Sequence, residues 1–288
     1  MTYKNQKKLI KINQKVDSLQ YRMDALKAKQ NELEENINNQ HENFTKKQEK
    51  KILKLQKNQE NKQEHFLKKK EAKQLHRQMN EPPKLTTLEE IGNAITHGCG
   101  AIFAMIAFIL LLLKSNTNLK IIASFVYGIS MFLMMLSSCL YHSFKSESTI
   151  KRIFRRFDYS SIYLLIGGTF APFFLVDWGN KLGIILFIVQ WIAIIVGITM
   201  VCIFGPGRLK WLHFPLYFII GWSGIMFIPG WIKNNLGLLF CILGGGIVYT
   251  FGMIPFARKN TKATHFIWHF FVLVGSIVQF LGIYLFVY

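Results

Sequence analysis

The sequence predicts an all-α membrane protein, in which a seven-transmembrane helix bundle follows an N-terminal cytosolic extension of coiled-coil-like helix. Three observations predict this class. From Ala94 onward, apolar residues gather in seven runs, each close to the roughly 20 residues that a helix needs to cross the apolar core of a bilayer. The first 80 residues are polar and charged instead. Within them, apolar residues recur at alternating steps of three and four, which is the spacing of a coiled-coil seam.

Two parts of the chain differ in composition, and they meet near Glu81-Pro82-Pro83. Residues 1–80 carry 20 basic and 10 acidic side chains, whereas residues 81–288 carry 15 basic and 6 acidic ones. We therefore predict a basic cytosolic extension over 1–80 and a transmembrane domain over 81–288. The basic residues of the second part flank apolar runs, as in membrane proteins. We expect them to face anionic lipid headgroups, and we expect no nucleic-acid partner.

The seven predicted spans are separated by short polar loops. Pro172 and Pro215 lie inside spans, where membrane helices tolerate proline because neighbouring groups satisfy the freed backbone atoms. The fifth span is the least regular, since two glycines, a serine and Pro229 interrupt it. The expected spans cover residues 94–113, 119–142, 158–176, 182–204, 211–228, 236–256 and 266–287.

Loop charges predict the orientation of the bundle. With residue 1 in the cytosol, ten basic residues fall in cytoplasmic loops and four in the opposite loops, which agrees with the enrichment of Lys and Arg on the cytoplasmic side. We therefore expect a cytosolic N-terminus and a C-terminus, Tyr288, that faces the outside or a lumen. The ten are Lys145, Lys151, Arg152, Arg155, Arg156, Arg208, Lys210, Arg258, Lys259 and Lys262, and the four are Lys114, Lys120, Lys181 and Lys233.

Ionisable residues at one end of the bundle indicate a functional site. His142 ends the second span, Asp158 begins the third, and His265 and His269 begin the seventh. Helix direction therefore places all four at the same membrane depth, where ionisable residues are costly and usually functional. His265 and His269 are four residues apart and so share one helix face. Because histidine is the commonest metal ligand among side chains, we predict a metal site.

The expected chemistry is that of catalytic zinc. Such a site commonly takes three protein ligands and leaves a fourth position to water. Asp158 would accept a hydrogen bond from that water as a general base. Ser138, one turn deeper than His142 on the same helix face, would support the site by hydrogen bonding. The alternative is that each histidine is an ordinary polar residue that finds its partners within the helix bundle.

These residues also carry a family resemblance. The chain from Glu89 to Tyr284 resembles the hemolysin III and progestin–adipoQ receptor family of seven-span proteins in four segments. The resemblance implies a zinc-binding fold with the N-terminus inside. It implies His142, His265 and His269 as zinc ligands, with Asp158 and Ser138 around the bound water. The four segments are EEIGNAITHGCGA (89–101), SSCLYHS (137–143), RRFDYSSIYLLIGGTFAPF (155–173) and HFIWHFFVLVGS (265–276).

Two other histidines have different expected roles. His97 lies in the first of those segments near the start of span one, and a supporting or packing role is expected for it. His213 lies beside Trp211, and we expect it at the membrane interface.

The extension has an apolar seam over residues 9–44. Nine of its eleven seam positions are apolar, which predicts either self-association or docking to a coiled-coil partner. The excess of Lys in the extension favours a partner with acidic flanks over a second copy. Residues 46–80 are expected to form a charged helix or a flexible linker, and a solvated helix without any partner is the remaining alternative. The seam consists of Leu9, Ile12, Val16, Leu19, Met23, Leu26, Gln30, Leu33, Ile37, Gln40 and Phe44.

Two functions from different classes are compatible with these observations. The first is a zinc-dependent membrane hydrolase of lipid amides, as the similarity to alkaline ceramidases implies. The second is a receptor-like signalling protein or a channel-like protein of the membrane in which zinc is structural. A lipid substrate or ligand is expected as a partner. Three ligands with an open fourth position favour the first. Membrane lysis has no support in the residues, because a strongly amphipathic lytic helix is absent.

Overall fold

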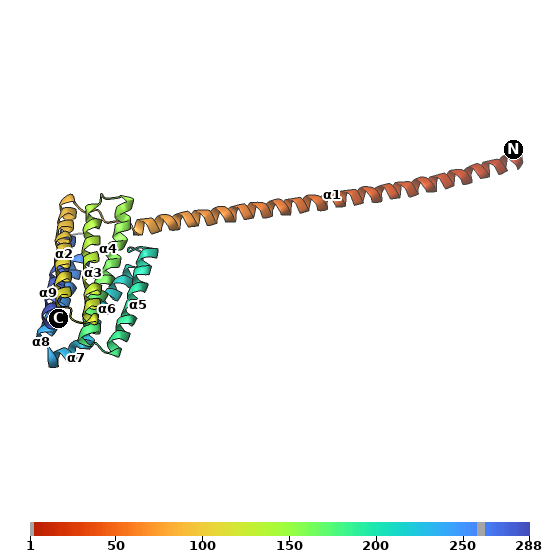
Figure 1. Ribbon diagram of the computed structural model, residues 1–288. Coiled ribbons are helices and arrows are strands. Elements are labelled where there is room, and N and C mark those ends of the chain that lie inside the picture. The colour runs from red at the N-terminus through yellow and green to blue at the C-terminus, as the bar shows by residue number, and fades with distance from the viewer. Residues whose placement is uncertain (1–2, 258–262) are drawn as a thin grey trace. The chain divides into compact units, whose positions relative to one another are not determined.

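A computed structural model describes residues 3–257 and 263–288 (Figure 1). The described residues contain helices and turns but no strand, so the predicted all-α class is confirmed. The chain folds as two compact units, Met1–Lys73 and Gln74–Tyr288. The second unit includes the end of the long first helix, from Gln74 onward.

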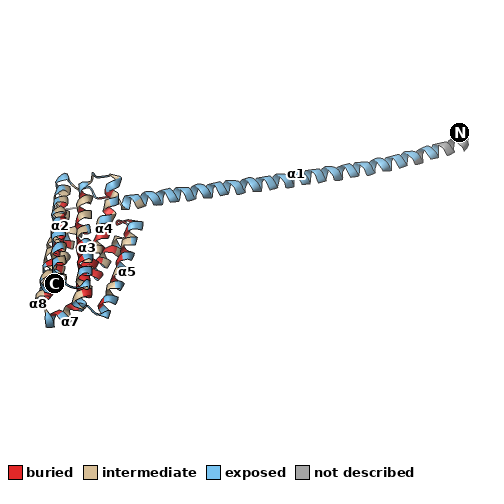
Figure 2. Ribbon diagram, in the orientation of Figure 1, coloured by how far each residue is buried: buried red, intermediate tan, exposed pale blue. Residues whose placement is uncertain are grey.

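A single helix, α1, runs from Tyr3 to Met79. It contains both the predicted seam and the charged segment that follows, so the linker alternative for residues 46–79 is wrong. The side chains described along α1 are exposed, apart from His76 near its end (Figure 2).

Among the described residues, seven helical segments are long and apolar enough to span a membrane, as predicted. Most begin and end within a few residues of the expected limits. The first and third spans start seven and nine residues earlier, and the fifth ends six residues later, at Asn234. The elements are α2 (Thr87–Lys114), α3 (Asn118–Ser143), α4 (Thr149–Pro172) with η1 (Phe173–Asp177), α5 (Lys181–Phe204), α6 (Lys210–Trp222) with η2 (Ser223–Phe227) and α7 (Ile228–Asn234), α8 (Leu236–Ala257) and α9 (Thr264–Phe286).

Two spans are irregular at their prolines and glycines. Pro172 has no N–H to donate, and the helix continues from Phe173 as a π-turn in which Trp178 N–H donates to Phe173 O at 2.9 Å. The fifth span changes to a 3₁₀ turn at Ser223–Phe227 and restarts as α7, with Pro229 in the first turn. The predicted irregularity of this span is therefore confirmed.

The first turn of α2 is polar and lies before the apolar run. Thr86 and Glu89 form a capping box, in which Thr86 N–H donates to Glu89 Oε2 at 2.9 Å and Glu89 N–H donates to Thr86 Oγ1 at 3.3 Å. Such a box satisfies two backbone donors that the helix itself leaves free. It starts the helix early enough to place Glu90 and Asn93 on α2.

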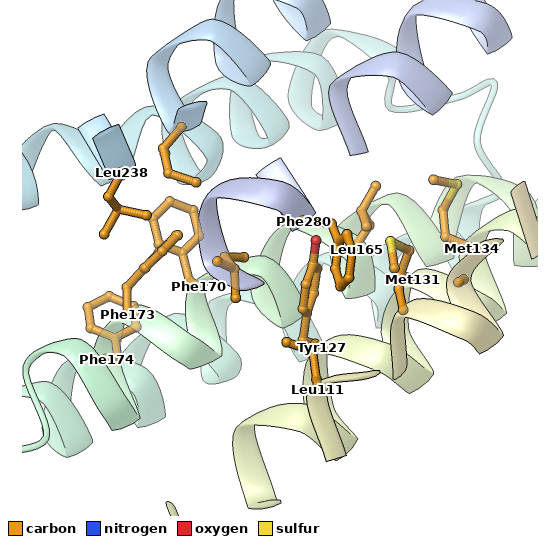
Figure 3. Packing of buried hydrophobic residues seen from close by; sticks show 14 of the residues in the cluster. Leu111, Tyr127, Met131, Met134, Leu165, Phe170, Phe173, Phe174, Leu238 and Phe280 are labelled. Atoms are coloured by element: carbon orange, nitrogen blue, oxygen red, sulfur yellow. The ribbon is translucent and has the colours of Figure 1, made fainter. Parts of the chain in front are cut away.

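Helix packing brings the first and last spans together. α2 packs against α3, α3 against α4, and α9 against both α8 and α2. The apolar core between them contains Met131 and Met134 on α3 and the aromatic rings of Phe170 and Phe280 (Figure 3). Outward-facing apolar residues such as Ile188 on α5 are exposed, as expected for a helix surrounded by lipid. This packing sets the starts of α2, α4 and α9 beside the end of α3.

Seven membrane spans would place the two chain ends on opposite faces of the membrane. Arg258, Lys259 and Lys262, three of the expected cytoplasmic charges, lie outside the described residues. From the loop charges we expect a tag before residue 1 to be cytosolic. A tag after Tyr288 should be reached by an impermeant antibody on intact cells, or be protected inside a lumen. Detecting both tags on the same face would contradict the seven-span assignment.

Candidate metal centre

Three histidines from two helices meet at one end of the bundle. His142 lies in the last turn of α3, and His265 and His269 lie in the first two turns of α9. One ligand nitrogen from each lies within 4.8 Å of the others. His142 and His269 are buried, and His265 is partly buried. The structure therefore brings together the three side chains that the sequence predicts as metal ligands.

Two of the three distances between the imidazole nitrogens are close to those of a tetrahedral metal site. His142 Nε2 lies 3.3 Å from His265 Nε2 and 3.0 Å from His269 Nε2. Metal–nitrogen bonds of about 2.0–2.1 Å would place two ligand nitrogens roughly 3.3–3.4 Å apart at a tetrahedral angle. Hydrogen bonds alone explain the arrangement poorly, because a neutral imidazole has one donor and one acceptor nitrogen and His142 Nε2 faces two other rings. Three imidazole nitrogens suit Zn²⁺ as well as copper, iron and nickel ions, so the cluster fits a divalent metal of this group.

A carboxylate fixes the orientation of the His142 ring. Glu90, in the first turn of α2, accepts a hydrogen bond from His142 Nδ1 at 2.7 Å. This bond places the ring proton on Nδ1 and leaves the Nε2 lone pair for a metal, the usual arrangement of metal-bound histidine. Asn93 Nδ2 lies 3.4 Å from the same Nδ1.

Lys151 compensates the charge of Glu90. Its Nζ donates to Glu90 Oε1 at 2.7 Å and to Phe144 O at 3.0 Å. The Lys151 side chain is 0% exposed, and a buried ammonium group without partners would be strongly destabilising. The sequence placed Lys151 among the cytoplasmic loop charges, whereas the structure buries it in the first turn of α4.

His97 contacts one of the three histidines from the side away from the expected metal position. Its Nε2 lies 2.9 Å from His269 Nδ1, and the two rings meet edge to face. The contact is the counterpart of the Glu90–His142 bond, because it occupies Nδ1 of His269 and leaves Nε2 for a metal. His97 thus has the supporting position that the sequence predicted.

Asp158 and Ser138 lie next to the histidine cluster. Asp158 is in the third turn of α4 and interacts electrostatically with His142, Arg155 and Ser138. Among the described residues, Ser138 Oγ, Asn93 Oδ1 and His97 Nδ1 are buried without a hydrogen-bond partner of good geometry. Buried polar atoms are normally paired. The centre therefore holds unused donors and acceptors beside the three histidines, as a site for a metal and a polar ligand would.

A cavity of about 180 Å³ reaches this cluster from inside the bundle. His97, Asp158, His265 and His269 line it at one end, and Trp231 of α7 lines it at the other. Most of the wall between them is apolar and comes from α4, α6, η2, α8 and α9. This wall includes Leu165, Phe170, Ile225, Leu243 and Val272.

His213 lies apart from the cluster, in the first turn of α6, and its expected place at the membrane interface stays a prediction. The ring is buried, and its Nδ1 lies 3.0 Å from the hydroxyl of Tyr163. The start of α6 turns the side chain inward against α4, while its neighbour Trp211 is exposed. His213 therefore stabilises the contact between these two helices.

Comparison with known proteins covers the membrane domain. The family model described as "Haemolysin-III related" matches residues 85–280. Hemolysin-3 of Bacillus cereus is 40% identical over 196 residues, which are 67% of this chain and 89% of that protein. The Hemolysin-3 homolog of Bacillus subtilis (strain 168) is 36% identical over 68% of this chain and 92% of its own length. The human monocyte to macrophage differentiation factor is 25% identical over 71% of this chain and 87% of its own length.

Removing the Glu90 carboxylate should weaken metal binding without removing a ligand. Loss of such a partner of a metal-bound histidine typically costs 10–100-fold in affinity, so we expect Glu90→Gln to bind Zn²⁺ about 10–100-fold more weakly. His269→Ala should lose most of the metal, because two imidazoles bind more weakly than three. Competition with a chromophoric chelator measures both. Glu147→Gln, an exposed carboxylate paired with Lys84, is the matched control. Wild-type affinity in Glu90→Gln would show that Glu90 does not orient His142.

Proposed function

The chain belongs to the haemolysin III-related family of multi-pass membrane proteins, and on this premise we propose that it is a zinc-dependent hydrolase of lipid amides. His142, His265 and His269 would hold the metal. One observation carries the proposal: two of these histidines and Asp158 line the same end of an apolar cavity. A potential reaction centre and a potential acyl-chain site are therefore continuous.

The residues around the cluster have the types that amide hydrolysis requires. Zinc bound to three imidazoles would lower the pKa of a coordinated water to about 7 and polarise a carbonyl group. Asp158 would accept the proton of the attacking water and deliver it to the leaving amine, as a general base and then a general acid. Glu90 and His97 would hold the rings of His142 and His269 with their Nε2 atoms directed to the metal.

The cavity supports a lipid as the substrate. Its lining is mostly aromatic and aliphatic, with few polar side chains away from the histidine end, which suits an acyl chain. Gly221 on α6 and Gly246 on α8 line it, and neither has another atom within 4 Å of the place where a Cβ would lie. These two glycines therefore leave the wall between α6 and α8 open to a bulky ligand.

A receptor-like function uses the same cavity differently. A lipid would then bind without being cleaved, and the metal would only stabilise the bundle. The two proposals differ in the role of Asp158, because a purely structural metal needs no general base.

Replacing Asp158 tests which proposal holds. We expect Asp158→Asn to retain zinc, because no ligand is removed, and to hydrolyse N-acyl lipids about 10²–10⁴-fold more slowly. Elemental analysis gives the metal content, and release of fatty acid from ceramide and N-acylethanolamine vesicles gives the activity. Asp177→Asn, which removes a carboxylate bonded to Trp231 at the far end of the bundle, is the control. Zinc-loaded wild-type protein that binds these lipids but cleaves none would favour the receptor-like function.

Filling the cavity should block the substrate without disturbing the metal. Leucine at position 246 would project into the space that the glycine leaves open, so Gly246→Leu should lose lipid binding and turnover while keeping zinc. Gly230→Leu is the matched control, because Gly230 also has no atom within 4 Å of a Cβ but does not line the cavity. Displacement of a fluorescent fatty acid measures binding. Unchanged binding in Gly246→Leu would place the lipid elsewhere.

A further inference from the structure

The apolar seam of α1 is exposed along its whole described length. Leu19, Leu26 and Leu33 are each more than half exposed, and they repeat at every seventh position. Isolated helices gain little stability from helix propensity and mostly depend on packing of an apolar face. Between residues 9 and 44 the described side chains add one hydrogen bond along the helix, from Gln30 to Glu34. The seam therefore needs a partner.

Charge along α1 is not evenly distributed. Residues 9–44 carry five basic and six acidic side chains, whereas residues 45–79 carry twelve basic and four acidic ones. The excess of Lys that argued against a second copy thus lies outside the seam. The seam segment itself is nearly neutral, and charge repulsion does not oppose pairing of two copies.

We propose that residues 9–44 of two copies pair as a parallel, in-register coiled coil, so that the protein is a homodimer. The two polar seam residues select this arrangement. In register, Gln30 meets Gln30 and Gln40 meets Gln40 of the partner copy, and the amides can bond to each other. An antiparallel pairing over residues 9–40 would instead set Gln30 opposite Leu19 and leave a buried amide without a partner, which is destabilising.

The branching of the seam residues agrees with two strands. Counting Leu9 as position a of the heptad, leucine occupies three of the five d positions, and the β-branched residues Val16 and Ile37 occupy two of the six a positions. β-branched residues at a with leucine at d favour parallel dimers over higher oligomers.

The flanking charges permit the parallel pairing and disfavour the reverse. In register, Lys29 lies across from Glu34 of the partner copy, and Arg22 lies across from Lys27. The attraction between Lys29 and Glu34 offsets the repulsion between Arg22 and Lys27. In the antiparallel arrangement Arg22 would face Lys29 of the partner copy twice, with no attractive pair to offset the repulsion.

The membrane domain holds the C-terminal end of α1 identically in every copy. Asn80 donates from Nδ2 to Phe204 O at 3.0 Å and accepts from Gly207 N–H at 2.9 Å. Arg155 donates to Asn80 O at 2.8 Å, and His76 Nε2 lies 3.0 Å from Phe204 O. In each copy, the same number of residues therefore separates the seam from the same end of the bundle. This favours parallel pairing of two copies in one membrane.

The pairing ends where the seam positions become charged. After Phe44 the next three seam positions are Lys47, Lys51 and Lys54. Lysines facing one another across a seam repel, so the two helices separate there.

Cysteine cross-linking of the full-length protein in native membranes tests the proposal. In a background with Cys99, Cys139, Cys202 and Cys241 replaced by Ala, a mild oxidant should convert Leu19→Cys and Ile37→Cys chains to disulfide-linked dimers. Facing residues in a seam lie within disulfide reach. Tyr21→Cys and Ala28→Cys, on the outer face of the same helix, should remain monomeric.

Adding Leu26→Asp and Leu33→Asp together to the Leu19→Cys or Ile37→Cys chain should abolish the cross-link. Adding Tyr21→Asp and Ala28→Asp together to the same chains should not. All variants should keep their zinc, which shows that the membrane domain is folded. Cross-linking of Leu19→Cys only to Gln30→Cys chains would show an antiparallel pair and overturn the proposal. Monomers at every seam position, or a cross-link to a different protein, would overturn it as well.

Discussion

A charged group buried in a helical bundle is stable only when partners balance it, and the arrangement around Glu90 follows from this constraint. Its carboxylate accepts from His142 on one oxygen and from Lys151 on the other. The three groups come from α2, α3 and α4, so one chain of bonds links three helices. Removing any member would leave an unpaired charge or a freely turning imidazole at low dielectric. The geometry of the histidine cluster depends on this chain.

Two sets of helices share the wall of the cavity around that chain. α2, α3, α4 and α9 supply the histidines and the groups that orient them. α4 and α9 also line the apolar part of the cavity, together with α6 and α8, which contribute glycines and aromatic residues. A substitution on α6 or α8 would therefore change the wall from a helix that carries none of the three imidazoles.

The spans and the three histidines are predictable from the sequence because each has a strong signal. Twenty apolar residues identify a span, and helix direction alone places His142 beside His265. The roles of Glu90 and Lys151 were missed for a physical reason. Hydropathy places the start of a span at its first apolar residues. The helices α2 and α4 begin about two turns earlier, and these additional polar turns carry Glu90 and Lys151 into the bundle. The burial of the His213 ring was not predicted, because it depends on packing against Tyr163 of α4, which no local pattern encodes.

The ligands of the histidine cluster are far apart in the chain, since His142 and His265 are separated by 123 residues. At roughly 5–20 residues per second, a ribosome needs on the order of 6–25 s to synthesise the interval. Throughout that time the cluster lacks the two histidines of α9, although Glu90 and His142 have already been synthesised. A metal that needs all three imidazoles would therefore bind only after the last helix has been made and has docked.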